Sequence, residues 1–166
     1  ADNVELNTQT WTRVRVHSSG TGAKHDVGLE LRNDQQRITI ALSGGLAKHL
    51  QWRGQLTQAT FDVAPVGTWQ LEQPGPLQLA RNDIQAGPWC WAQAGAQLCA
   101  GLNKKGMNWS SDLKLTELPL AVAQPWLSAG ITLDGTVNGS LTAHYTPDQS
   151  LSGQAQFDTT PIELKY

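Results

Sequence analysis

Few residues in this chain have the types and spacing that chemistry at a site requires. The histidines lie far apart and form no His-x-x-x-His pair, the spacing that places two metal ligands on one helix face. Gly20-Thr-Gly22 lacks the rest of a dinucleotide-binding motif, no Gly-x-Ser-x-Gly sequence is present, and the carboxylates are dispersed. We therefore expect no catalytic, metal or cofactor site, and a protein that is not an enzyme. The histidines are His17, His25, His49 and His144.

The two cysteines, Cys90 and Cys99, flank a stretch that can fold as a hairpin around Ala94-Gly95. With a two-residue loop there, Cys90 lies opposite Cys99 in a non-hydrogen-bonded pair, where Cα atoms approach to about 4.5 Å. That distance is within reach of a disulfide. Two reduced, buried thiols in a cytosolic protein are the alternative. The register favours the disulfide, and with it an oxidising compartment such as a periplasm.

The aromatic residues are mainly tryptophan, with seven Trp against two Phe and two Tyr. Exposed Trp rings could stack on sugars, as in a β-sandwich carbohydrate-binding module. Alternation with aliphatic residues assigns three of them to an apolar face: Trp52, Trp69 and Trp109. The three that could form an exposed platform come from distant segments: Trp11, Trp89 and Trp91.

All these residues depend on β-strands for their placement. Apolar residues fall on every second position in segment after segment, as in Val27-Gly-Leu29-Glu-Leu31 and Ile38-Thr-Ile40-Ala-Leu42. Such alternation puts aliphatic side chains on one face of a sheet and polar side chains on the other. The predicted strands cover residues 4–17, 26–33, 36–43, 52–63, 68–72, 76–80, 83–92, 97–102, 107–116, 131–137, 140–146, 150–158 and 161–165.

Turn signals separate the predicted strands. Asn138-Gly139 is the strongest hairpin signal, because both residues tolerate positive φ. The polar stretch 18–25 is predicted to be a loop. Residues 45–50 could form one helical turn, and residues 118–127 contain helix formers, although Pro125 limits any regular helix to a few residues. The sequence therefore predicts an all-β chain with one or two short helical segments.

Composition limits the class of protein further. A chain of 166 residues suits one domain, here taken as residues 1–166. A net charge of −2 with scattered basic residues argues against nucleic-acid binding. No apolar run is long enough to span a membrane. Ala1 begins a polar sequence without Met, which indicates a mature protein or a piece of something larger.

Alternation alone leaves two uses for the apolar face. Two packed sheets would enclose it as the core of a closed β-sandwich. A single curled sheet would leave it as the lining of an open trough. Leu dominates the face, Phe is nearly absent, and small residues interrupt it, which favours the trough slightly.

Several segments in order resemble the TamB family of translocation and assembly module subunits. The resemblance covers about residues 50–142, and the remaining residues match only in their strand pattern. The segments are Trp52-Arg-Gly-Gln-Leu56, Val66-Gly-Thr-Trp69-Gln-Leu71, Pro76-Leu77-Gln-Leu79, Cys90 with Leu98-Cys99, Trp109, Leu118-Pro-Leu120 with Trp126-Leu127, and Leu133-Asp-Gly135-Thr-Val-Asn-Gly139-Ser-Leu141.

The resemblance implies a fragment of a longer periplasmic protein, from its C-terminal β-rich, AsmA-like region, anchored in the inner membrane by an N-terminal helix absent here. It implies an elongated, strongly curved, taco-like sheet with an apolar concave interior. It also implies an outer-membrane partner of the Omp85 type, TamA, and roles in phospholipid transport and in autotransporter and outer-membrane protein assembly. A chaperone-like hold on client β-strands is the alternative use of the same surface.

The residues that the resemblance assigns to this surface, as contacts for lipid or client, are all leucines. No catalytic residue or cofactor is implied. The leucines are Leu56, Leu71, Leu77, Leu79, Leu98, Leu113, Leu115, Leu133 and Leu141.

Overall fold

The chain is almost entirely β-structure, as predicted. The computed structural model describes residues 4–6, 9–47, 50–64, 66–128, 130–148, 150–161 and 163–165. Its strands are β1 (Val4–Leu6), β2 (Gln9–Trp11), β3 (Arg13–Gly20), β4 (His25–Arg32), β5 (Gln36–Leu46), β6 (Trp52–Val63), β7 (Gly67–Leu71), β8 (Gly75–Leu79), β9 (Asp83–Gln93), β10 (Ala96–Lys105), β11 (Asn108–Pro119), β12 (Thr132–Asp134), β13 (Thr136–Thr146), β14 (Ser150–Thr159) and β15 (Glu163–Lys165).

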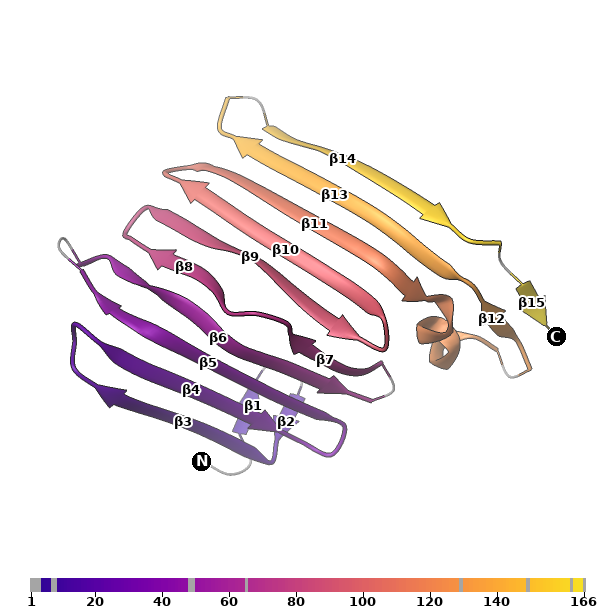
Figure 1. The fold of residues 1–166 in the computed structure, drawn as a ribbon, viewed down its shortest axis with the longest axis horizontal. Coiled ribbons are helices and arrows are strands. Elements are labelled where there is room, and N and C mark those ends of the chain that lie inside the picture. The colour runs from indigo at the N-terminus through magenta and orange to yellow at the C-terminus, as the bar shows by residue number, and fades with distance from the viewer. Residues whose placement is uncertain are drawn as a thin grey trace.

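Eleven of these strands form one antiparallel sheet (Figure 1). Their order is β14-β13-β11-β10-β9-β7-β6-β5-β4-β3, so most neighbours in the sheet are also neighbours in the chain. β8 shares the place of β7, because both strands pair with β6 on one side and with β9 on the other. Two small sheets, β1-β2 and β12-β15, lie outside this ladder.

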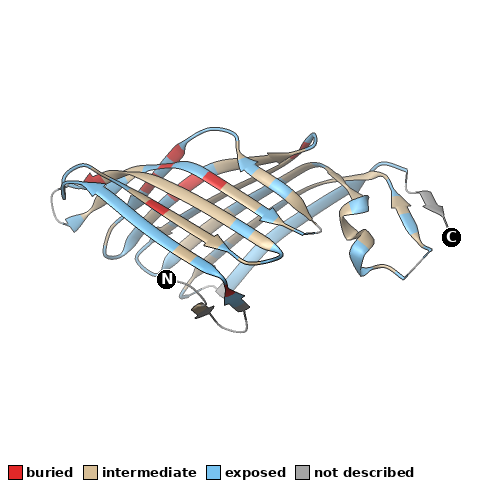
Figure 2. Cartoon of the chain, turned by 90° about the horizontal axis from the view of Figure 1, so that it is seen from below, coloured by how far each residue is buried: buried red, intermediate tan, exposed pale blue. Residues whose placement is uncertain are grey.

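The sheet is arched rather than flat (Figure 2). Register shifts place an extra residue in β6, β9 and β11 relative to the strands beside them. Such bulges bend a strand and increase its twist. The curved single sheet that we expected is therefore present, and the closed sandwich is not, since no second large sheet stacks on this one within the described residues.

The predicted hairpin at Asn138-Gly139 is wrong. Both residues lie inside β13 and pair with β14, and Gly139 also pairs with Leu115 of β11, while Asn138 lies opposite the bulge of β11. The side-chain oxygen of Asn138 accepts a hydrogen bond from the backbone N–H of Glu117 at 2.8 Å. The break between β12 and β13 lies earlier, at Gly135, whose φ of 128° suits glycine. Pairing on both sides thus overrides the local turn preference.

The first predicted strand and the polar loop after it also differ from the structure. Residues 4–17 divide among β1, β2 and the beginning of β3. Ser18 and Ser19 continue β3 in register with Val27 and Asp26, so the loop is shorter than predicted. Two backbone hydrogen bonds between Thr21 and Lys24 close the turn.

One helical segment matches its prediction. Leu120–Trp126 forms a 3-10 helix, named η2, that contains Pro125. The other candidate, residues 45–50, is not a helix at its beginning, because Gly45 and Leu46 end β5. Residues 48 and 49 lie outside the described residues.

The cysteine prediction is confirmed. Cys90 and Cys99 form a disulfide, with their Cα atoms 4.0 Å apart. The register around it also agrees with the count from the sequence, since Gln93 faces Ala96 and Cys90 faces Cys99. Positive φ values at Ala94 and Gly95 make the two-residue turn between the strands.

Removing the disulfide tests its contribution to stability. We expect the double variant Cys90→Ser/Cys99→Ser to lose about 2–3 kcal/mol of unfolding free energy, because the cross-link closes a short loop in the unfolded chain. Urea unfolding of the variant and the oxidised parent measures this difference. The reduced parent is the control and should unfold with the variant; coincidence of all three midpoints would contradict the prediction.

Candidate functional site

The register of the eleven strands gathers the apolar side chains on one face. Side chains of directly paired residues point to the same side of a sheet. We call the side that carries Leu56 the apolar face. Three cross-strand rows illustrate it: Leu71, Trp91, Leu98, Leu115, Gly139 and Phe157; Trp89, Ala100, Leu113, Leu141 and Ala155; and Leu46, Trp52, Leu79, Ile84, Lys104, Trp109, Tyr145 and Leu151.

The bulges keep this face continuous. In β6 the apolar residues switch from even positions, such as Leu56, to odd positions, such as Ala59 and Phe61. The extra residue between Leu56 and Gln58 occurs at that switch and restores both sets to one side. Similar shifts occur in β9 after Ala86 and in β11 after Leu115. Each change of phase in the sequence therefore coincides with a bulge.

Eight of the nine predicted leucines lie on the apolar face, and one does not. Leu133 belongs to β12, which pairs with β15 outside the large sheet. The short alternating segment around Leu133 predicts a strand correctly but does not show which sheet it joins. The eight that the register brings together are Leu56, Leu71, Leu77, Leu79, Leu98, Leu113, Leu115 and Leu141.

The tryptophans do not form an exposed platform. Trp52, Trp69 and Trp109 lie on the apolar face as predicted, but Trp89 and Trp91 lie there too. The disulfide between them occupies the polar face, which fixes both indoles on the other side. Trp11 is buried, with 5% of its surface exposed.

Aromatic contacts strengthen the apolar face locally. Trp91 packs on Phe61 and, edge to face, on Trp89. Trp109 stacks on Tyr145 across β11 and β13, with ring centroids 6.3 Å apart. Such pairs add to the free energy gained from area burial alone. The apolar face is thus mainly aliphatic and carries aromatic clusters. The amino-acid composition alone did not show where these clusters lie.

Burial falls from the middle of the face toward its edges. Leu56 and Leu77 on the central strands are buried, whereas Leu113 and Leu141 are 36% and 40% exposed. On the edge strand β14, Phe157 is 60% exposed. In Figure 2 the outermost strands of the arch are drawn mostly as exposed, and the inner strands mostly as intermediate with some buried positions. The curvature of the sheet therefore shelters the middle, while much of the face stays open.

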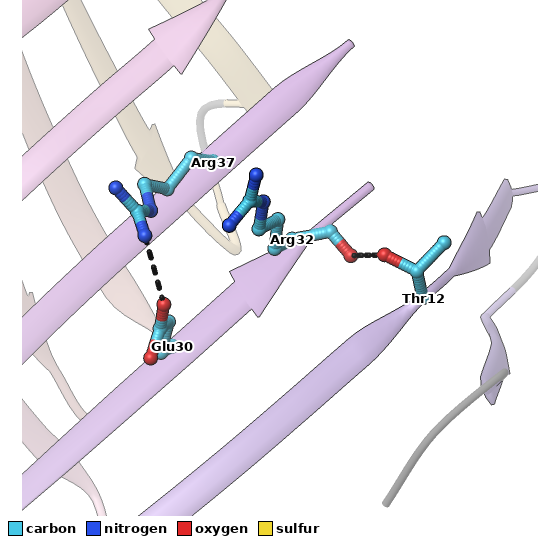
Figure 3. Close-up of polar contacts among 4 residues, drawn as sticks. All are labelled: Thr12, Glu30, Arg32 and Arg37. Carbon is cyan, nitrogen blue, oxygen red and sulfur yellow. Dashed lines mark hydrogen bonds and ion pairs between the residues drawn. The ribbon is translucent and has the colours of Figure 1, made fainter. Parts of the chain in front are cut away.

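The opposite face is polar. Arg37 of β5 forms an ion pair with Glu30 of β4 at 3.4 Å, the one ion pair found within the described ranges (Figure 3). The hydroxyl of Thr12 donates to the backbone carbonyl of Arg32 at 2.9 Å and fastens the start of β3 to the end of β4. A surface ion pair of this kind contributes little stability.

The histidines are not brought together. His17 and His144 lie on the polar face of different strands, and His49 is outside the described residues. His25 accepts a hydrogen bond from the indole N–H of Trp52 at 2.9 Å. The described part of the chain has no group of three His, Cys, Asp or Glu that could hold a metal ion. Nor does any helix within it have the length and apolarity to span a membrane.

Comparison with known proteins identifies the family. The family model described as the N-terminal domain of TamB matches residues 1–166, and the resemblance had led us to expect the C-terminal β-rich region instead. No curated protein and no solved structure matches the chain. The family match covers every residue, including the first 45, which resembled the family only in strand pattern. The chain therefore belongs to the TamB family.

Proposed function

We propose that this chain is a non-enzymatic part of a periplasmic conduit that shields phospholipid acyl chains between the inner and outer membranes. The observation that carries the proposal is the apolar face, which continues across eleven strands and stays partly open. An exposed apolar surface of this extent on a soluble protein usually marks an interaction site. Membership of the TamB family supports an envelope setting and a role in outer-membrane assembly.

Transfer free energy explains how such a surface works without a catalytic group. Each methylene removed from water contributes about 0.8 kcal/mol. The leucines of neighbouring strands offer similar apolar positions, so an acyl chain can slide along the face between positions of nearly equal free energy. The polar face keeps the conduit in solution while the apolar face carries the lipid.

Membership of the TamB family supports the wider setting that we propose. The proposal includes an inner-membrane anchor in a longer protein, an Omp85-type barrel partner, TamA, and support of autotransporter and outer-membrane protein assembly. The Cys90–Cys99 disulfide supports an oxidising compartment, since such bonds persist in the periplasm and are rare in the cytosol.

A second candidate is a chaperone-like hold on client strands. Within the described sheet, β14 pairs only with β13, so β14 presents an unpaired backbone edge. An extended client segment could add to such an edge by backbone hydrogen bonding. The edge position of β14 and its exposed Leu151 and Phe157 favour this candidate there.

Photo-crosslinking distinguishes the two candidates. A photoreactive amino acid at Leu113 should give phospholipid adducts in cells, because that side chain is exposed on the apolar face. The matched control is Lys114, the next residue, which lies on the polar face opposite Cys99 and should give none. Protein adducts at Leu113 in place of lipid would support the client-holding function and contradict the lipid conduit.

Arginine substitutions test whether the face is open. We expect Leu113→Arg to leave the unfolding midpoint almost unchanged, because a long side chain on a partly exposed surface can extend its charge into water. Leu56 is only 5% exposed. Leu56→Arg should therefore lower the free energy of unfolding by about 3 kcal/mol or more, because it buries a charge. Equal, large losses in both variants would show that the face is a closed core.

A further inference from the structure

Within the described register, the apolar face carries one formal charge. Among the residues that the described register places on this face, Lys104 is the only Lys, Arg, Asp or Glu. Its direct cross-strand neighbours are Ile84 on β9 and Trp109 on β11. A charged side chain on an apolar surface is unfavourable unless it has a partner. The groups around Lys104 therefore indicate what it could bind.

Lys104 lies near one end of its strand, beside aromatic rings. Trp109 next to it stacks on Tyr145. Trp and Tyr are favoured where an apolar environment meets a polar one, because each ring has an apolar body and a polar group. Two residues inward along the same strand, about 7 Å away, Leu102 faces the same side and is 38% exposed. At the end of the strands, the apolar face therefore carries a cation, Lys104, next to aromatic side chains.

The charges around this end favour an anion. A cavity of about 270 Å³ at the strand ends is lined by Trp52, Arg53, Lys104 and Lys105, among others. One carboxylate, that of Asp83, also lines this cavity, so three cationic side chains stand against one anionic side chain. Within the described residues, Lys104 has no carboxylate at ion-pair distance.

We propose that Lys104 binds the phosphate of a phospholipid whose acyl chain lies inward over Leu102 and Leu113. This inference rests on the proposed function and adds an orientation to it, with the headgroup at the Lys104 end of the strands. A lysine ammonium binds phosphate as a point charge with three rotatable donors. Its four-carbon stem can lie against Ile84 and Trp109 while the charge meets the headgroup.

Calorimetric titration of the chain with short-chain amphiphiles tests the site. The probes are monomeric dihexanoyl phosphatidylglycerol, dihexanoylglycerol, which lacks the phosphate, and glycerol 3-phosphate, which lacks the chains. We expect Lys104→Met to weaken phosphatidylglycerol binding about tenfold, as the loss of a hydrogen bond to a charged group would do, and to leave dihexanoylglycerol binding unchanged. Lys104→Arg, which keeps the charge, should remain within a few-fold of the parent.

Lys114→Met is the matched control, because Lys114 lies on the polar face, and it should bind both amphiphiles like the parent. If Lys104→Met binds phosphatidylglycerol as the parent does, Lys104 is an ordinary lysine with a packed stem, and the inference fails while the proposed function stands. If glycerol 3-phosphate binds as tightly as the lipid, the site is for a free phosphate and the inference fails. If the parent binds neither amphiphile, the proposed function fails as well.

Discussion

The backbone hydrogen-bond ladder between antiparallel neighbours is the interaction on which this structure depends. The described residues include only six buried hydrophobic side chains, and the large sheet has no second layer to bury its apolar face. Most of the organisation therefore comes from pairing between strands adjacent in the chain. That arrangement leaves the apolar face available for binding, whereas a sandwich would use the same side chains to form its core.

The large antiparallel sheet also bends, and the places where its strand pairing is interrupted show where. β7 and β8 share one place between β6 and β9, so residues 72–74 interrupt pairing in the middle of the sheet. Beside that gap β9 carries its bulge, and the disulfide joins β9 to β10 a few residues further on. The backbone N–H of Glu72 still bonds to the carbonyl of Cys90 at 2.9 Å, which keeps the gap closed. Curvature and cross-linking thus occur in the same region.

Much of the fold could be predicted because the relevant information is local. Period-two alternation located most strands to within a few residues, and a simple count gave the Cys90–Cys99 register. The predictions failed where long-range pairing decides. Asn138-Gly139 has the sequence of a turn, and only pairing with the neighbouring strands shows that it lies inside β13. The bulge after Ala86 changes the phase of the alternation, so the sequence alone does not show on which face Trp89 lies. Leu133 alternates like the other leucines, but its sheet partner lies about thirty residues later.

The apolar face, the polar exterior and the cation Lys104 near one end together describe a surface suited to an amphiphile held by its chains. Five of the seven tryptophans lie on the apolar face, so their fluorescence reports on what covers it. The sharpest test is quenching by phospholipids with brominated acyl chains, compared with the same lipids without bromine. Strong quenching by the brominated lipid alone is the predicted result. Emission that stays unchanged at saturating brominated lipid would contradict an acyl chain lying on this face.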